Sequence, residues 1–145
     1  MSPRICSVGI NFYIYSYFAY IYTYNIEIIL TFSDEPDAPG RPQITDWDKD
    51  HVDLQWPEPA SDGGSPITGY IVQKKEKGSP YWINAIHVPP NQTNATVPDL
   101  TEGQEYEFRV IAVNAAGQSE PSEPSDLITA KPRYREYNST LIFIL

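Results

Sequence analysis

Three aspartates alternate with other residues in Asp46-Trp47-Asp48-Lys49-Asp50, which is the spacing that begins a calcium-binding EF-hand loop. Counted from Asp46, the position that needs glycine is His51, and the position that needs a bidentate glutamate is Pro57. No helical pattern flanks the run. The run therefore predicts an acidic turn before a strand rather than a metal site.

Nucleophilic catalysis requires a nucleophile, a base and an orienting group. The single cysteine, Cys6, lies in an unusual N-terminal segment, and His51 and His87 lie in or near different predicted strands. Gly63-Gly64 lacks the Lys-Ser/Thr pair that completes a phosphate-binding loop. One cysteine and two histidines are also too few for a structural zinc site of the usual kind. We expect no enzyme activity, no cofactor and no metal.

Asparagine in the pattern Asn-X-Ser/Thr occurs at Asn91, Asn94 and Asn138. Such triplets accept N-linked glycans only when a chain enters the secretory pathway, and they also arise by chance. They are the best support in the sequence for an extracellular protein, which we keep as an alternative.

Length and charge narrow the classes of protein that remain. The chain has 145 residues and a formal net charge of −9. One cysteine excludes a scaffold held together by internal disulfides. The excess of acid argues against binding to nucleic acid, whose affinity comes largely from Lys and Arg on phosphates.

Composition divides the chain into three segments, with residues 34–134 as one domain and residues 1–33 and 135–145 as extensions outside it. Residues 1–33 are rich in Tyr and Ile, and their only charged residues are Arg4 and Glu27. They are long enough to span a bilayer, but polar residues interrupt them and tyrosine belongs at membrane interfaces. A membrane-directed segment, a structured extension and translated non-coding sequence all stay open for them, and we do not expect membrane association.

Residues 34–134 have the pattern of an all-β sandwich. Gly- and Pro-containing turns recur at short spacing between runs that alternate apolar and polar residues, and no stretch has room for a long amphipathic helix. The alternation predicts seven strands, at 43–45, 51–56, 69–75, 81–85, 94–97, 105–113 and 127–130.

One face of these strands carries the apolar side chains that should form the core. In the strongest strand, Tyr106, Phe108 and Val110 share one face, while Glu107 and Arg109 share the other. The predicted core residues are Trp56, Tyr70, Val72, Leu100, Tyr106, Phe108 and Val110.

Several of these features, in this order, resemble the fibronectin type III domain over about residues 36–132. The carrying motifs are a proline-rich start, Trp56 on the second strand, a Leu-to-Tyr corner from Leu100 to Tyr106, and the sixth strand with its following loop, Val113 to Ser122. The resemblance implies a seven-stranded immunoglobulin-like sandwich. A corner tyrosine can bury its ring and bond its hydroxyl to upstream backbone.

Two stretches, 46–52 and 60–74, further resemble repeats of the titin, twitchin and projectin giant muscle proteins. That resemblance implies a non-catalytic spacer and protein-binding module of a sarcomeric scaffold, with a kinase domain elsewhere in some members. The implied partners are neighbouring immunoglobulin and fibronectin type III domains and sarcomeric proteins, including the myosin filament. The implied location is the cytoplasmic myofibril, and the implied state is a monomer.

The alternative is an extracellular or membrane-anchored adhesion or receptor domain at the cell surface. Integrin-binding members of the family carry Arg-Gly-Asp in the loop after the sixth strand. Here residues 114–120 read Asn-Ala-Ala-Gly-Gln-Ser-Glu, so that activity is not expected.

The strand count also predicts where the domain begins and ends in space. A chain that crosses a sandwich an odd number of times enters at one pole and leaves at the other. We therefore expect the ends near Pro39 and Lys131 to lie at opposite poles, as a spacer requires.

Overall fold

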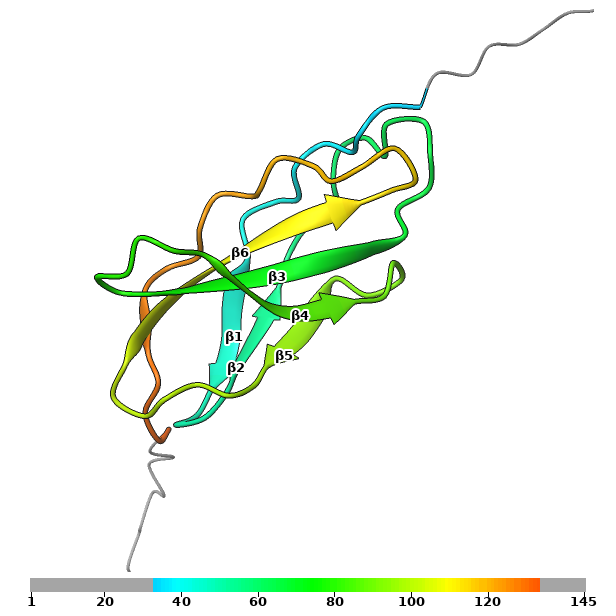
Figure 1. The fold of residues 1–145 in the computed structure, drawn as a ribbon. Helices are drawn as coiled ribbons and strands as arrows, with labels where there is room; N and C mark the ends of the chain where they lie inside the picture. Colours follow the sequence, from blue (N-terminus) through cyan, green and yellow to red (C-terminus); the bar gives the residue numbers. More distant parts are fainter. Residues whose placement is uncertain (1–32, 134–145) are drawn as a thin grey trace, which may run out of the picture. The chain divides into compact units, whose positions relative to one another are not determined.

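The computed structural model describes residues 33–133, and these residues form strands without a helix (Figure 1). The seven strands are β1 (Gln43–Trp47), β2 (Val52–Gln55), β3 (Gly69–Glu76), β4 (Ile83–Val88), β5 (Asn94–Val97), β6 (Glu105–Val113) and β7 (Ile128–Thr129). The predicted all-β class with seven strands is confirmed.

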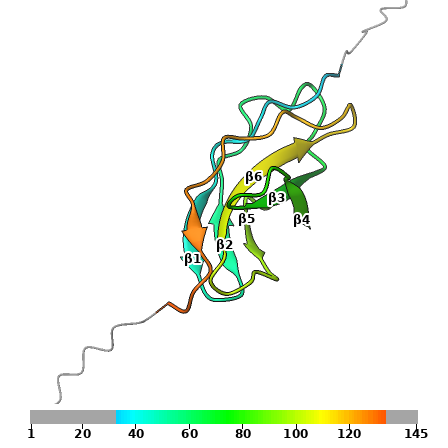
Figure 2. The ribbon, with the colours of Figure 1, turned by 60° about the vertical axis from the view of Figure 1, so that its left-hand side comes forward.

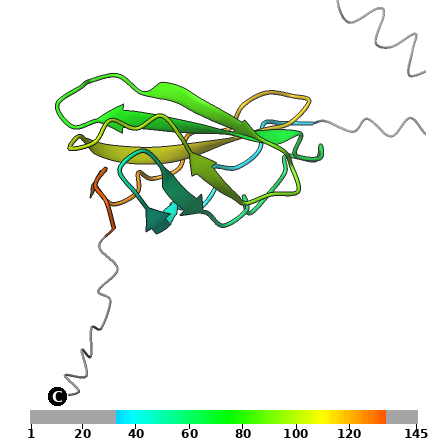
Figure 3. The ribbon, with the colours of Figure 1, turned by 90° about the horizontal axis from the view of Figure 1, so that it is seen from below.

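The strands form two layers, which Figure 3 shows from the side, with the strands running across the picture. One sheet has the order β1-β2-β5 and the other β4-β3-β6-β7, and all neighbouring strands pair antiparallel. The longest pairing joins β3 to β6 from Gly69 opposite Val113 to Glu76 opposite Tyr106. This register places Tyr70 opposite Ala112 and Val72 opposite Val110, so both pairs face the other sheet.

The core lies between the two sheets and has the composition that alternation predicts. The seven predicted core residues are all buried, with exposed fractions between 0% and 7%. The Trp56 and Tyr70 rings meet edge-on with their centroids 5.6 Å apart, and Tyr106 stacks on Phe108 at 6.4 Å. The Tyr106 hydroxyl accepts a hydrogen bond from the backbone N–H of Thr101 at 3.1 Å, which ties the β5–β6 connection to the core.

The fourth strand begins later than the predicted range 81–85. Its alternation of large residues suggested a start at Tyr81, yet pairing with β3 begins at Ile83 and runs to Val88. Residues 78–81 form the turn that follows β3: Gly78 has φ +87°, and the Tyr81 N–H donates to the Ser79 hydroxyl. Tyr81 is therefore 73% exposed and stands outside the ladder.

The last strand is shorter than the predicted range 127–130. Only Ile128 and Thr129 pair with β6, opposite Tyr106 and Glu105. The rest of β6 is covered by residues 119–125, which run beside it without regular strand pairing (Figure 1, orange).

The described chain enters and leaves the sandwich at opposite ends, as Figures 1 and 2 show. At one end Asp34 bonds Gly63 in the β2–β3 connection, and at the other Ala130 bonds Gly103 and Gln104 in the β5–β6 connection. Residues 33–133 contain no helix long and apolar enough to cross a bilayer.

Candidate functional site

The first part of the domain, residues 34–42, is fastened along the β2–β3 connection, and we call it the leading segment. The backbone N–H groups of Asp34, Asp37 and Gly40 donate to the carbonyls of residues 63, 61 and 57 at 2.8–3.0 Å. Every third residue therefore points its N–H at the sandwich. Pro36 and Pro39 fall between the bonded residues, Pro42 follows the last of them, and all three prolines are buried. Proline fixes φ near −65°, and a period of three is that of a polyproline-type extended chain.

Asn114, at the end of β6, ties the leading segment to two loops. Its side-chain amide N–H groups donate to the backbone carbonyls of Asp34 at 2.7 Å and Asp62 at 2.8 Å. Its side-chain oxygen accepts from the N–H groups of Ala116 and Gly117. The side chain thus uses both donor hydrogens and both acceptor positions of its amide. Because Asn114 is only 5% exposed, water cannot easily replace these four bonds.

Two glycines allow the leading segment to lie this close. Gly63 has φ +75°, and a Cβ atom there would stand 2.2 Å from the Asp34 carbonyl oxygen. A Cβ atom on Gly117 would stand 2.8 Å from the Glu35 carboxylate. Any other residue at Gly63 would be strained and would push Asp34 away.

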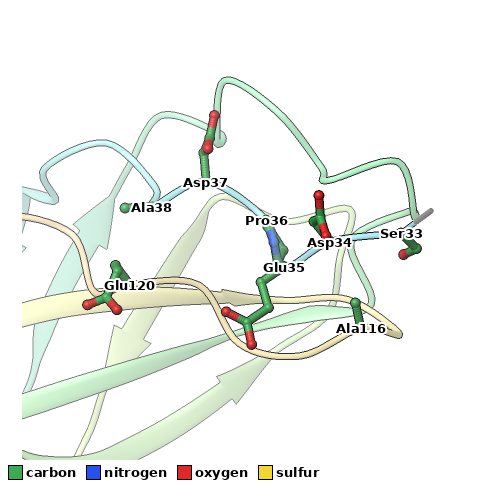
Figure 4. Close-up of a pocket in the computed structure, with 8 residues that line it drawn as sticks. All are labelled: Ser33, Asp34, Glu35, Pro36, Asp37, Ala38, Ala116 and Glu120. Atoms are coloured by element: carbon green, nitrogen blue, oxygen red, sulfur yellow. The ribbon is translucent and has the colours of Figure 1, made fainter. Parts of the chain in front are cut away.

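An acidic hollow of about 560 Å³ lies where the leading segment meets the loop after β6 (Figure 4). Its lining includes Asp34, Glu35, Asp37 and Glu120. Within residues 33–133, no three His, Cys, Asp or Glu side chains are grouped closely enough to hold a metal ion.

A second repeat of three fastens the chain after β6. Ser119, Ser122 and Ser125 each donate a backbone N–H to a β6 carbonyl, and each hydroxyl accepts the N–H of the same β6 residue at 2.9–3.0 Å. Their partners are the alternate core residues Ala112, Val110 and Phe108, in that order. Each hydroxyl also donates to the next carbonyl of its own chain. We call residues 119–125 the serine segment.

From one bonded serine to the next the serine segment advances by three residues, whereas β6 advances by two. One residue per repeat is therefore extra, as in a β-bulge, and cannot join a regular ladder. The serine hydroxyls replace the missing backbone partners, so the buried N–H groups of β6 stay bonded. Arg41 links this segment to the leading one, because its guanidinium donates to the Pro124 carbonyl and the Asp126 carboxylate, both at 2.7 Å.

The exit of the domain is fastened as well. Ala130 and residues 103–104 exchange two backbone hydrogen bonds at 2.7 and 2.9 Å. Arg133 pairs with Asp46, and its guanidinium carbon lies 5.1 Å from the centre of the Trp47 ring. Both ends of the described chain are thus bonded to the sandwich, at Asp34 and at Arg133.

The outer face of the four-stranded sheet carries a polar and aromatic cluster. Trp82 crosses this face, with the Arg109 guanidinium carbon 4.4 Å and the Lys75 ammonium 4.9 Å from its ring centre. Arg109 donates through Nε to Gln73 at 2.7 Å, and Lys75 pairs with Glu107 at 3.0 Å. Burial lowers the pKa of the Arg109 guanidinium below its usual value.

The two histidines weighed for chemistry belong to different sheets, with His51 just before β2 and His87 on β4. His51 shares a hydrogen bond of 2.7 Å with the neighbouring Asp50 carboxylate. This bond raises the pKa of His51 and lowers the pKa of Asp50. His87 lies on β4, beside Ile71 of β3, and Cys6 lies outside the described residues.

Two of the three asparagines in glycosylation triplets can be placed. Asn91 and Asn94 are exposed, before and at the start of β5, whereas Asn138 lies outside the described residues. The basic run Lys74 to Lys77 lies at the end of β3, where Lys77 pairs with Glu105 at 2.6 Å. Sequence reasoning missed the structural roles of Asn114 and of Ser119, Ser122 and Ser125, although the spacing of three between the serines is visible in the sequence.

Known proteins resemble this chain over the same region. The family model described as "Fibronectin type III domain" matches residues 37–128. The "Titin homolog" of Caenorhabditis elegans is 41% identical over 99 residues, which are 68% of this chain and, rounded, 0% of that protein. The cardiac-type "Myosin-binding protein C" of Mus musculus is 41% identical over 92 residues, 63% of this chain and 7% of that protein.

Among solved structures, titin module A71 from human cardiac muscle is 43% identical, with a TM-score of 0.62. The match covers 68% of this chain and 95% of that module. The chain thus spans less than a tenth of the curated relatives named above, yet nearly all of a single titin module. On its matched residues, its two-sheet topology and its corner tyrosine, the chain belongs to the fibronectin type III domain family.

Proposed function

We propose that residues 34–134 fold as one non-catalytic module that acts as a spacer and protein-binding unit in a sarcomeric scaffold. The observation that carries this proposal is that residues 34–42 and 130–133 are bonded to the sandwich at its opposite ends. A module of this design passes position and load from one neighbour to the next. The similarity to a titin homolog and to myosin-binding protein C supplies the muscle setting.

The proposed partners are neighbouring immunoglobulin and fibronectin type III domains, together with sarcomeric proteins including the myosin filament. The relative named Myosin-binding protein C makes myosin the first to test. Acidic residues outnumber basic ones by 17 to 7 between residues 34 and 132, and this repulsion favours a monomer. The proposed location is the cytoplasmic myofibril.

The test is the position of the protein in muscle cells. An antibody raised against residues 34–134 should stain permeabilised cells in a striated pattern and leave intact cells unstained. Staining of intact cells, without striation, would refute the sarcomeric proposal.

The second candidate is an extracellular or membrane-anchored adhesion or receptor domain. Its support is the exposure of Asn91 and Asn94, each in a glycosylation triplet. Mass spectrometry of the protein from its own cells separates the two proposals. An N-glycan on Asn94 would establish the secretory route, and unmodified Asn91 and Asn94 in a striated protein would remove it.

A further inference from the structure

The outer face of the four-stranded sheet differs from the rest of the surface in charge. This face is turned toward the viewer in Figure 1. The outer face along β3, β6 and the turn after β3 carries three of the eight Lys and Arg residues between 33 and 133: Lys75, Lys77 and Arg109. The same face carries two acids, Glu105 and Glu107, each paired with a lysine, against 15 acids elsewhere in that range. An acidic partner is therefore repelled by most of the domain and least by this face.

Arg109 is the basic residue of this face that has no carboxylate partner among residues 33–133. Residues 33–133 contain three arginines, and Arg41 and Arg133 pair with Asp126 and Asp46. Arg109 bonds only the neutral Gln73 through Nε, and no carboxylate of the described residues pairs with it. Trp82 holds the guanidinium plane from one side. A half-buried arginine fixed in this way is ready for a bidentate bond with a carboxylate.

Next to Arg109 the same face is apolar. Ile71 and Ile111 lie opposite each other on β3 and β6 and are 6% and 7% exposed, although they face away from the core. A hollow of about 330 Å³ follows, lined among others by Ile71, His87 and Val113. Arg109 is two residues from Ile111 on β6, so the guanidinium and the hollow are separated by roughly two to four residues of an extended chain.

We propose that this face binds an extended acidic segment of another polypeptide, with a carboxylate on Arg109 and an aliphatic side chain in the hollow beside Ile71 and Val113. Arginine and tryptophan are frequent at the centres of such interfaces. The site is separate from the two ends of the module. Its failure would leave the spacer role untouched.

The test uses the full chain labelled with ¹⁵N and a synthetic peptide that repeats Leu-Ser-Ser-Glu. Titration should shift the amide signals of Ile71, Arg109, Ile111 and Val113 and the Arg109 Nε–H signal in a saturable way. Two control peptides, with Gln for Glu and with Ala for Leu, should each bind at least about tenfold more weakly, since each removes one of the two contacts. These controls leave the protein unchanged, so folding does not affect the comparison.

Variants of the chain complete the test. Arg109→Gln should weaken the Leu-Ser-Ser-Glu peptide about tenfold or more, and Arg109→Lys should weaken it less. Arg41→Gln is the matched control, because Arg41 already pairs with Asp126, and it should leave binding unchanged. Equal binding of the Glu and Gln peptides, equal binding to Arg109→Gln, or shifts that gather around Lys131 and Arg133 would each overturn the proposal.

Discussion

In β6 every second side chain faces the core, whereas in the serine segment beside it every third side chain faces β6. The two runs share one set of hydrogen bonds yet obey different periods. The strand buries large apolar side chains, and the segment buries three small hydroxyls that act as backbone substitutes. The leading segment repeats the period of three with buried prolines. Strands of period two therefore build the core of this module, and segments of period three bind the chain to it before β1 and after β6.

The largest effect should come from the core that the strands build. Trp56→Ala should lower the free energy of unfolding by about 3–5 kcal/mol, because it empties a site that is 2% exposed. Trp82→Ala is the matched control on the outer face. It should cost about 1–2 kcal/mol, mainly its contacts with Arg109 and Lys75. Denaturant melts of both variants would measure the difference, and equal losses would place Trp56 outside the core.

The next effect should come from the leading segment. Asn114→Ala should cost about 2–3 kcal/mol, because it removes a buried side chain and leaves four backbone groups of three segments without this partner. Asn84→Ala removes an exposed amide with one side-chain partner, Gln73, and should change stability by less than about 0.5 kcal/mol. If both asparagines gave the same small loss, Asn114 would not hold the segment.

The serine segment should give a smaller loss. Ser122→Ala removes the acceptor of the buried Val110 N–H and should cost about 1–2 kcal/mol. The control is Glu123→Gln, which changes an exposed neighbour and should leave the melt within about 0.5 kcal/mol. A Ser122→Ala melt as stable as that of the unchanged chain would show that the hydroxyl is dispensable.

The sequence predicted the parts of the fold that have a period of two, and it did not reveal the segments that have a period of three. Alternation located β3 and β6 because their inner faces carry Tyr70, Val72, Phe108 and Val110 between polar residues. It misplaced the start of β4, since Tyr81 and Trp82 have strand-like side chains but serve a turn and the outer face. Strand propensity reports how a side chain fits a half-buried surface, and it does not say which surface.

A search for alternating apolar and polar residues does not detect segments with a period of three. Ser119, Ser122 and Ser125 are separated by Glu-Pro pairs, which read as a turn. Asn114 looked like an ordinary loop residue, because its role depends on Asp34 and Asp62, far away in the sequence. A scan for small polar residues at every third position would have found the serines but could not have named β6 as their partner.

The smallest predicted effect concerns pH at the turn before β2. The His51–Asp50 bond raises the pKa of His51 above its usual 6.5 and lowers that of Asp50 below 3.8. The pair therefore adds stability between these two values. Its contribution is lost as pH falls through the Asp50 pKa or rises through the His51 pKa. An NMR titration should show the His51 ring midpoint above 6.5, and Asp50→Asn should lower it; an unchanged midpoint in that variant would dismiss the pair.

The most direct test of the two fastened segments is amide hydrogen exchange of the full chain, read residue by residue. The structure predicts slow exchange at every third backbone N–H of both segments, namely Asp34, Asp37, Gly40, Ser119, Ser122 and Ser125. The intervening N–H groups of Glu35, Ala38, Arg41, Glu120, Glu123 and Asp126 make no such bonds and should exchange fast. One slow amide in three would establish that the leading segment and the serine segment are bonded to the sandwich at this spacing. Uniformly fast exchange across residues 34–41 and 119–126 would contradict it.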